Sequence, residues 1–235
     1  LEGMVMAIGG GLVEVTAIVP SGMCPGHFDL SPHDVKLLER ACVVILHGFE
    51  GEQFLNAALD AIDNKSIQKV SLDVEGNLMI PSLYLKAVEA ISDWLCSYRP
   101  ERQDTFVQNT LGCREQVVAA TNEIREKTKA LRLETVKAIC SSMQSEFVAW
   151  VGLEVVETYD RQEDMSPQEL VNIVKTAKQQ GVRCVIDNLQ SGSDIGRQVA
   201  EDIGARHIVL TNFPAGDSYT DALHENVNKI IRGCR

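Results

Sequence analysis

The chain has 235 residues, 45% of them hydrophobic and 23% charged, and its formal net charge is −11 at pH 7. These proportions are ordinary for a globular protein, and the length allows one large domain or two small ones. The negative charge argues against nucleic acid as a partner, because nucleic-acid binding needs a basic surface. No apolar run reaches the roughly 18 residues that span a bilayer. We recognise no signal segment in the sequence, which starts directly with Leu1-Glu2-Gly3-Met4.

Seven cysteines are spread widely along the chain, and no two of them form a CxxC pair. An odd number at wide spacing is not typical of a disulfide framework or a zinc finger. Cys42, Cys140 and Cys184 lie in apolar, strand-like runs, and we interpret them as small buried hydrophobic residues. So many apparently free thiols favour a reducing compartment.

In the first part of the chain, strand-like and helix-like segments alternate. Ser31 and Pro32 are typical of a helix start. The run Cys-Val-Val-Ile-Leu at 42–46 is continuously apolar, as in a buried strand of a parallel sheet. We expect strands at 13–19, 42–46 and 69–72, and helices at 34–40, 52–62 and 81–98.

A long polar helix is expected next, from about Glu101 to Leu131, with one apolar stripe at helical spacing. It would reach about 46 Å, longer than a small lobe is wide. Alternation then resumes, with strands expected at 135–140, 153–158, 182–187 and 207–211, and helices at 145–151, 167–180, 192–203 and 217–231. The pattern predicts an α/β fold with parallel sheets. The expected organisation is an N-terminal α/β lobe (1–100), a connecting backbone helix (101–131) and a C-terminal α/β lobe (132–235).

Ligands of open α/β sheets bind outside the carboxyl ends of the strands, so the segments that follow the expected strands are the candidate site. These segments are 20–29, 47–52, 73–79, 141–144, 187–190 and 211–216.

The segment Val15-Thr-Ala-Ile-Val-Pro-Ser-Gly-Met-Cys-Pro-Gly-His-Phe-Asp-Leu-Ser-Pro32 resembles the first binding loop of zinc and manganese ABC-transporter solute-binding proteins, the TroA-like family of cluster A-I. Further similar segments are 41–50, 76–101, 142–158 and 219–231. The resemblance implies two lobes joined by one long backbone helix, with a metal ion held between them. It also implies an extracytoplasmic protein, in the periplasm or as a cell-surface lipoprotein, that is monomeric, performs no catalysis and delivers its ion to a membrane permease.

The family's metal ligands are histidines and carboxylates, and this sequence departs from most of them. The matching positions carry glycine, amides or a hydroxyl, namely Gly26, Asn77, Gln144, Asn188 and Thr211 or Asn212. Neutral amides do not compensate the charge of a bare divalent ion. His27 lies one place after the first position, and Asp187 lies one place before the fourth.

Three explanations stay open. In the first, a metal ion is bound by Cys24, His27, His47 and Met143. The ion is zinc, manganese or a soft metal such as copper, which sulfur and imidazole ligands suit. In the second, the cleft binds a chelated metal, such as a corrinoid, haem or siderophore; grouped with it is a degenerate paralogue that binds no metal and acts as an interaction module. The cleft residues for either solute are Asn77, Met79, Gln144, Asp187, Asn188 and Asn212. In the third, Cys24 and His27 are the nucleophile and base of an enzyme, although no third orienting residue is evident.

Overall fold

The structure is a computed structural model that describes residues 1–20, 23, 28–48, 55–56, 59–60, 62–64, 66–192, 194–213 and 218–234. The chain divides into two compact units. The first contains Leu1–Gly76 and Ser82–Arg114, and the second contains Asn77–Pro81 and Glu115–Arg235. Both are α/β, their described strands are all paired in parallel, and a long helix is present, which confirms the predicted fold class.

The first unit holds a parallel pair of strands and several helices. Its elements are α1 (Glu2–Gly9), α2 (Pro32–Arg40), β1 (Val43–Leu46), β2 (Gln68–Ser71), α4 (Pro81–Tyr98, from Ser82 on) and the start of α5 (Gln103–Ala130). The Ser31 hydroxyl accepts a hydrogen bond from the Asp34 amide and the Asp34 carboxylate accepts one from the Ser31 amide, so α2 begins with a complete capping box. Leu38 of α2 packs with Leu46 of β1 in the apolar core of this unit.

Some expectations for the first unit are wrong. Cys42, which the sequence predicts to be buried in a strand, is exposed and precedes β1. Residues 13–19 form no strand, although their β-branched residues favour one. Strand propensity needs a pairing partner, and this segment instead lays Ile18 against the core around Leu38 and Leu46. Helix α1 was not foreseen, although it buries Met4, Val5 and Ile8. The helix expected at 52–62 falls largely outside the described residues.

The second unit is built on a four-stranded parallel sheet in the order β4-β3-β5-β6. The strands are β3 (Lys137–Ser141), β4 (Glu154–Tyr159), β5 (Cys184–Asn188) and β6 (Arg206–Leu210). The helices are the rest of α5, α6 (Ser145–Val151), α7 (Pro167–Gln180), α8 (Asp194–Ile203) and α9 (Tyr219–Gly233). Gly181 ends α7 with a φ of 66°, a left-handed conformation that glycine adopts without strain.

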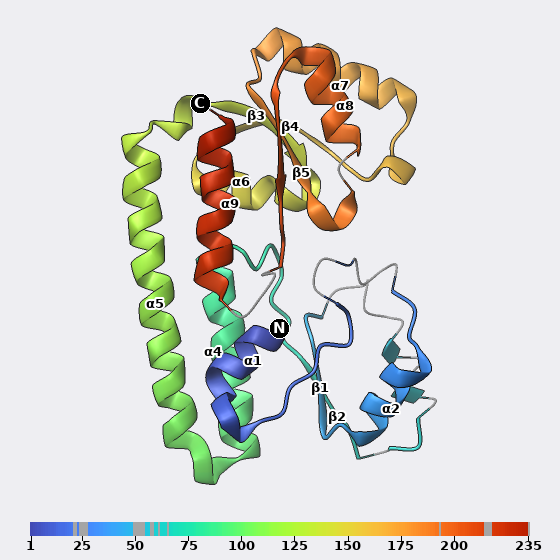
Figure 1. Cartoon of the computed structure of the whole chain (residues 1–235), viewed down its shortest axis with the longest axis vertical. Coiled ribbons are helices and arrows are strands. Elements are labelled where there is room, and N and C mark those ends of the chain that lie inside the picture. Colours follow the sequence, from blue (N-terminus) through green and yellow to red (C-terminus); the bar gives the residue numbers. More distant parts are fainter. Residues whose placement is uncertain are drawn as a thin grey trace. The chain divides into compact units, whose positions relative to one another are not determined.

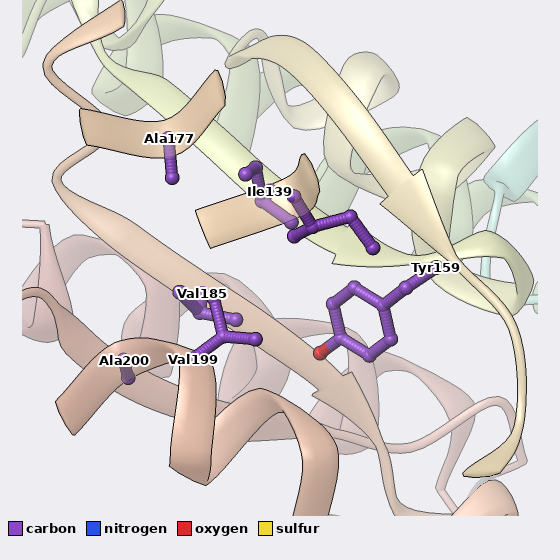
Figure 2. Packing of buried hydrophobic residues seen from close by; sticks show 7 residues of the cluster. Ile139, Tyr159, Ala177, Val185, Val199 and Ala200 are labelled. Carbon is purple, nitrogen blue, oxygen red and sulfur yellow. The ribbon is translucent and has the colours of Figure 1, made fainter. Parts of the chain in front are cut away.

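The two faces of this sheet carry different helices (Figure 1). On one face, Ile139 and Val185 pack against Ile173 and Ala177 of α7 and Val199 of α8, and Figure 2 shows the ring of Tyr159 in the same cluster. Cys184 and Ile186 alternate with Val185, so they point to the opposite face. None of the described helices is long and apolar enough to cross a membrane.

Candidate functional site

Four amide side chains come together in the second unit. Gln144 ends the short 3-10 helix η6 (Ser142–Gln144) after β3, and Asn188 is the last residue of β5. Asn212 follows β6, and Asn77 comes from the segment that precedes α4. Parallel strands end at one edge of a sheet, which explains how three of these residues meet although they are far apart in sequence. We call Asn77, Gln144, Asn188 and Asn212 the amide cluster.

Hydrogen bonds join all four members. The Asn212 Oδ1 atom accepts from Asn77 Nδ2 at 2.9 Å and from Gln144 Nε2 at 2.6 Å. Gln144 Nε2 also donates to Asn188 Oδ1 at 3.1 Å. The backbone of Asn77 is held as well, because its N–H donates to the Glu146 carboxylate at 3.1 Å.

The backbone fixes which way each amide faces. The Met79 N–H can only donate and it meets Asn77 Oδ1 at 2.8 Å, while the Met143 carbonyl can only accept and it meets Asn77 Nδ2 at 3.1 Å. Asn77 therefore presents its nitrogen to Asn212, Asn212 presents oxygen, and Gln144 must present nitrogen. The Gln144 side chain is 0% exposed, and its Oε1 atom has no hydrogen-bond partner among the residues that the structure describes.

An unsatisfied buried acceptor is costly, so this oxygen marks a place where a hydrogen-bond donor or a cation would be stabilised. The four side chains of the cluster supply amide oxygen and nitrogen atoms but no formal charge. Among the described residues, no three His, Cys, Asp or Glu side chains gather closely enough to hold a metal ion.

Helix α9 holds the loop that carries Asn212. Asn226, which is fully buried, donates from Nδ2 to the Thr211 carbonyl at 2.9 Å and accepts from the Thr211 N–H at 3.2 Å. At the start of the same helix, the Tyr219 hydroxyl donates to the Met79 carbonyl at 2.8 Å. The helix thus positions the segments that carry Asn212 and Asn77.

Asp187 lies apart from the amide cluster. It precedes Asn188 on β5 and therefore points to the other face of the sheet. Its Oδ1 accepts from the Tyr159 hydroxyl at 2.6 Å, and its Oδ2 lies 2.6 Å from His207 Nε2. Burial raises the pKa of the Tyr159 phenol, and the Asp187 charge adds to the effect, so the phenol stays protonated and donates. A methyl group at Gly196 would overlap both the carboxylate and the hydroxyl.

A small polar cavity of about 100 Å³ adjoins this second group, with Ser141, Asp160 and Ser191 in its lining beside Tyr159 and Asp187. The Asp160 carboxylate accepts from the Ser142 hydroxyl at 2.6 Å. Ser191, which also lines the cavity, accepts a hydrogen bond from Asn188 Nδ2 at 2.8 Å, so the cavity and the amide cluster have a common neighbour.

The remaining candidate residues are distributed as follows. Met79 is fully buried and meets the amide cluster through its backbone N–H. Met143 meets it through its carbonyl, and its side chain is 47% exposed. His47 is half-buried and directly follows β1 in the first unit, next to Gly48. Cys24 and His27 lie outside the described residues.

Sequence reasoning missed the partners that orient these side chains. Tyr159 and His207 gave no signal as partners of Asp187, because they approach it only once β4, β5 and β6 are side by side. Asn226 could have been noticed as a polar residue on the apolar stripe of a helix, between Leu223 and Ile230. Such a buried amide nearly always has partners.

The family model described as "Zinc-uptake complex component A periplasmic" matches residues 1–233. The sequence has no match among curated proteins. A cadmium-bound periplasmic metal-binding protein from Candidatus Liberibacter asiaticus aligns over 100% of this chain and 96% of its own, with a TM-score of 0.84 and 15% identity. A zinc-bound ZnuA deletion mutant aligns over 99% and 94%, with a TM-score of 0.82 and 20% identity. The manganese complex of the binding protein FpvC from Pseudomonas aeruginosa aligns over 99% and 94%, with a TM-score of 0.82 and 16% identity.

Proposed function

Because the chain belongs to the family of periplasmic zinc-uptake complex component A proteins, we propose that it is the extracytoplasmic solute-binding component of an ABC transporter. It captures a metal ion as a monomer of two lobes, delivers it to a membrane permease and performs no catalysis. The family match over residues 1–233 is the observation that carries this proposal. Similar structures that hold cadmium, zinc and manganese support it at the level of the fold.

In this proposal, the amide cluster is the part of the binding site that the second unit contributes. Its members donate or accept hydrogen bonds and carry no charge, and Gln144 Oε1 is the acceptor that stands open. Charge compensation for a metal ion must therefore come from other residues. We assign it to the Cys24 thiolate, with His27 and His47 as imidazole ligands, a set that favours copper(I) or another soft ion over manganese.

A chelated metal is the second candidate, and the amide cluster is the observation that favours it. A corrinoid, haem or siderophore brings its own ligands to the metal, so the protein needs hydrogen bonds rather than charge. Gln144 Oε1 would accept a hydrogen bond from such a chelate.

Metal content and colour of the same anaerobically purified sample test the proposal. Capture of a bare ion predicts near-stoichiometric metal by mass spectrometry and affinity for copper(I), measured by competition with a chromophoric chelator. Cys24→Ala and His27→Ala should each weaken that affinity by more than about 100-fold, beyond the usual effect of residues that only support a ligand. Cys42→Ala is the matched control, because Cys42 is also a thiol of the first unit but precedes β1.

The outcomes separate the candidates. Unchanged affinity in both Cys24→Ala and His27→Ala would refute the ligand assignment. Visible absorbance that is lost in Gln144→Ala would favour a chelated metal. Absence of any metal, of any chromophore and of binding to copper(I), zinc or manganese would overturn the capture of a bare ion and leave a module that has lost its cargo.

A further inference from the structure

The small cavity beside Asp187 lies past the apolar cluster, on the face of the sheet that α7 and α8 cover. Ser141 comes two residues after Ile139 on β3, and Asp187 comes two residues after Val185 on β5. Residues two apart on a strand share a face, so both polar side chains follow apolar members of that cluster. The cavity measures about 100 Å³. Since one water molecule takes about 30 Å³ in the liquid, a small ion with some of its water fits inside.

The Ser141 side chain has an open hydrogen-bonding position in this cavity. The residue lines the cavity and is only 4% exposed. Its hydroxyl makes no hydrogen bond with any residue that the structure describes, whereas the hydroxyl of the next residue, Ser142, donates to Asp160. A buried polar group without a partner is costly. The Ser141 oxygen, which has two lone pairs to offer, would therefore be stabilised by a ligand in the cavity.

The charges around the cavity are mainly negative. Its described lining includes one basic residue, Arg161, and four acidic residues, Asp160, Glu163, Asp187 and Asp194. The Asp194 carboxylate is paired with the Arg197 guanidinium, with 3.2 Å between oxygen and nitrogen. A small ligand that suits this lining carries positive charge.

Asp160 and Asp187 have no ion pair with Arg or Lys in the part of the chain that the structure describes. Asp160 is exposed and accepts from the Ser142 hydroxyl. Asp187 is 2% exposed, accepts from the Tyr159 hydroxyl and lies beside His207, which is charged only when protonated. A buried carboxylate among neutral donors gains from a nearby cation. The two acids thus offer negative charge at the inner and outer ends of the cavity.

We propose that this cavity binds calcium, held by the Asp187 and Asp160 carboxylates and the Ser141 hydroxyl and completed by water. Calcium takes about six to eight oxygen ligands in flexible geometry, water included, whereas magnesium demands a near-ideal octahedron. Two carboxylates balance the two charges of the ion. Among the described residues, no three acidic, His or Cys side chains converge on a metal position, so water supplies much of the coordination. The expected Kd is on the order of 10⁻⁴–10⁻³ M, as in extracellular calcium modules.

The calcium site does not depend on the proposed cargo, because it uses neither the amide cluster nor the thiol and imidazole ligands assigned above. The two sites have a common neighbour all the same. Ser191 lines the cavity and accepts from Asn188 Nδ2 at 2.8 Å, and Asn188 in turn accepts from Gln144. Binding of calcium should therefore be sensed by the amide cluster.

The test is a calcium titration of the whole, metal-free protein by calorimetry, with thermal unfolding of the same samples. We expect one saturable site and a rise of the thermal midpoint with calcium concentration. Potassium chloride at equal ionic strength is the reference, because a net charge of −11 attracts counterions without any site. A midpoint that potassium raises as much as calcium does would overturn the proposal, as would the absence of saturable binding.

Three variants locate the ion. Ser141→Ala and Asp160→Asn should each weaken the calcium affinity by at least about 10-fold, the least that residues supporting a metal ion usually cost. Asp164→Asn is the matched control, because Asp164 follows the same strand but does not line the cavity. Ser141→Ala should keep the thermal midpoint of the calcium-free protein, since its hydroxyl has no described partner to lose. Equal calcium affinity in the wild type and all three variants would place the ion elsewhere and refute the assignment.

Two further measurements separate this proposal from that of the cargo. Cys24→Ala and His27→Ala should bind calcium as the wild type does, so either assignment can fail while the other stands. The nuclear magnetic resonance signal of the Asn188 side-chain amide should shift with calcium in the wild type and not in Asp160→Asn. Loss of calcium binding in Cys24→Ala or His27→Ala would show that calcium occupies the cargo site and would overturn a separate calcium site.

Discussion

Replacing Asn226 by alanine tests how the amide cluster is held. The side chain is fully buried and makes two hydrogen bonds to the backbone of Thr211, at 2.9 and 3.2 Å. Alanine removes both and leaves a carbonyl and an N–H without partners, at about 1–3 kcal/mol each. Thr211 is only half-buried, so water can partly replace the lost partners. We therefore expect a loss of about 3 kcal/mol in the free energy of unfolding of the second unit.

The assay is urea unfolding followed by tryptophan fluorescence. Trp94 belongs to the first unit and Trp150 to the second, so a Trp94→Phe background makes the signal report the second unit alone. Asn228→Ala is the matched control, since Asn228 lies two residues further along α9 and accepts one exposed hydrogen bond from Lys127. We expect the control to stay within about 0.5 kcal/mol of its parent.

A loss below about 1 kcal/mol in Asn226→Ala, or one equal to that of Asn228→Ala, would refute the reasoning, because the Thr211 carbonyl and N–H would then lose both partners at almost no cost. In the same variant, Thr211, the residue before Asn212, has lost its two hydrogen bonds with Asn226. The nuclear magnetic resonance signals of the Asn212 and Gln144 side-chain amides should therefore shift or broaden.

Three further predictions concern titratable groups. Tyr159→Phe should cost about 2 kcal/mol at neutral pH, because a charge-assisted hydrogen bond to Asp187 is lost. The pKa of Tyr159 is raised in the folded protein. The stability that the phenol contributes is therefore lost as the pH rises past about 10, where the unfolded phenol ionises. Above that pH, the urea midpoint of Tyr159→Phe should fall less steeply than that of the wild type. Ser166→Ala should cost about 1 kcal/mol. In a carboxyl titration it should raise the pKa of Glu169, which the Ser166 hydroxyl and backbone N–H both lower, only part of the way to its ordinary value, because the backbone N–H is kept. Burial raises the pKa of Cys140 to about 12, so iodoacetamide at pH 8 should modify it only after unfolding; modification of the folded protein would contradict this.

Local sequence signals predicted the elements of the second unit well. The starts of α6 and α7 and their last residues agree with the sequence. In α7 a capping serine, a proline and a terminal glycine specify the ends locally, and α6 ends at a glycine in the same way. The expected strand at 13–19 failed for the opposite reason, since a strand depends on a partner that the sequence of the segment does not contain. Helix α1 lacks a side-chain cap and so gave no start signal.

The site could be predicted in position but not in detail. The rule of the carboxyl edge led to the segments 141–144, 187–190 and 211–216, and the family resemblance singled out Gln144, Asn188 and Asn212 within them. The structure joins these three residues by hydrogen bonds, while their role in binding stays a prediction. The rule selects the end of a strand but not a face of the sheet. It therefore could not tell Asp187 from Asn188, which are neighbours on one strand and point to opposite faces.

The amide cluster is neutral because its side chains are amides, and hydrolysis can remove the nitrogen of an amide. Hydrolysis of the Asn212 side-chain amide would release ammonium and leave a carboxylate of nearly the same shape. Its Oδ1 could still accept from Asn77 and Gln144, so the fold need not change while the cluster gains a negative charge. Slow deamidation during storage would therefore convert a neutral cluster into one that attracts cations. Freshly purified and aged samples of this protein should accordingly be compared before any metal affinity is ascribed to it.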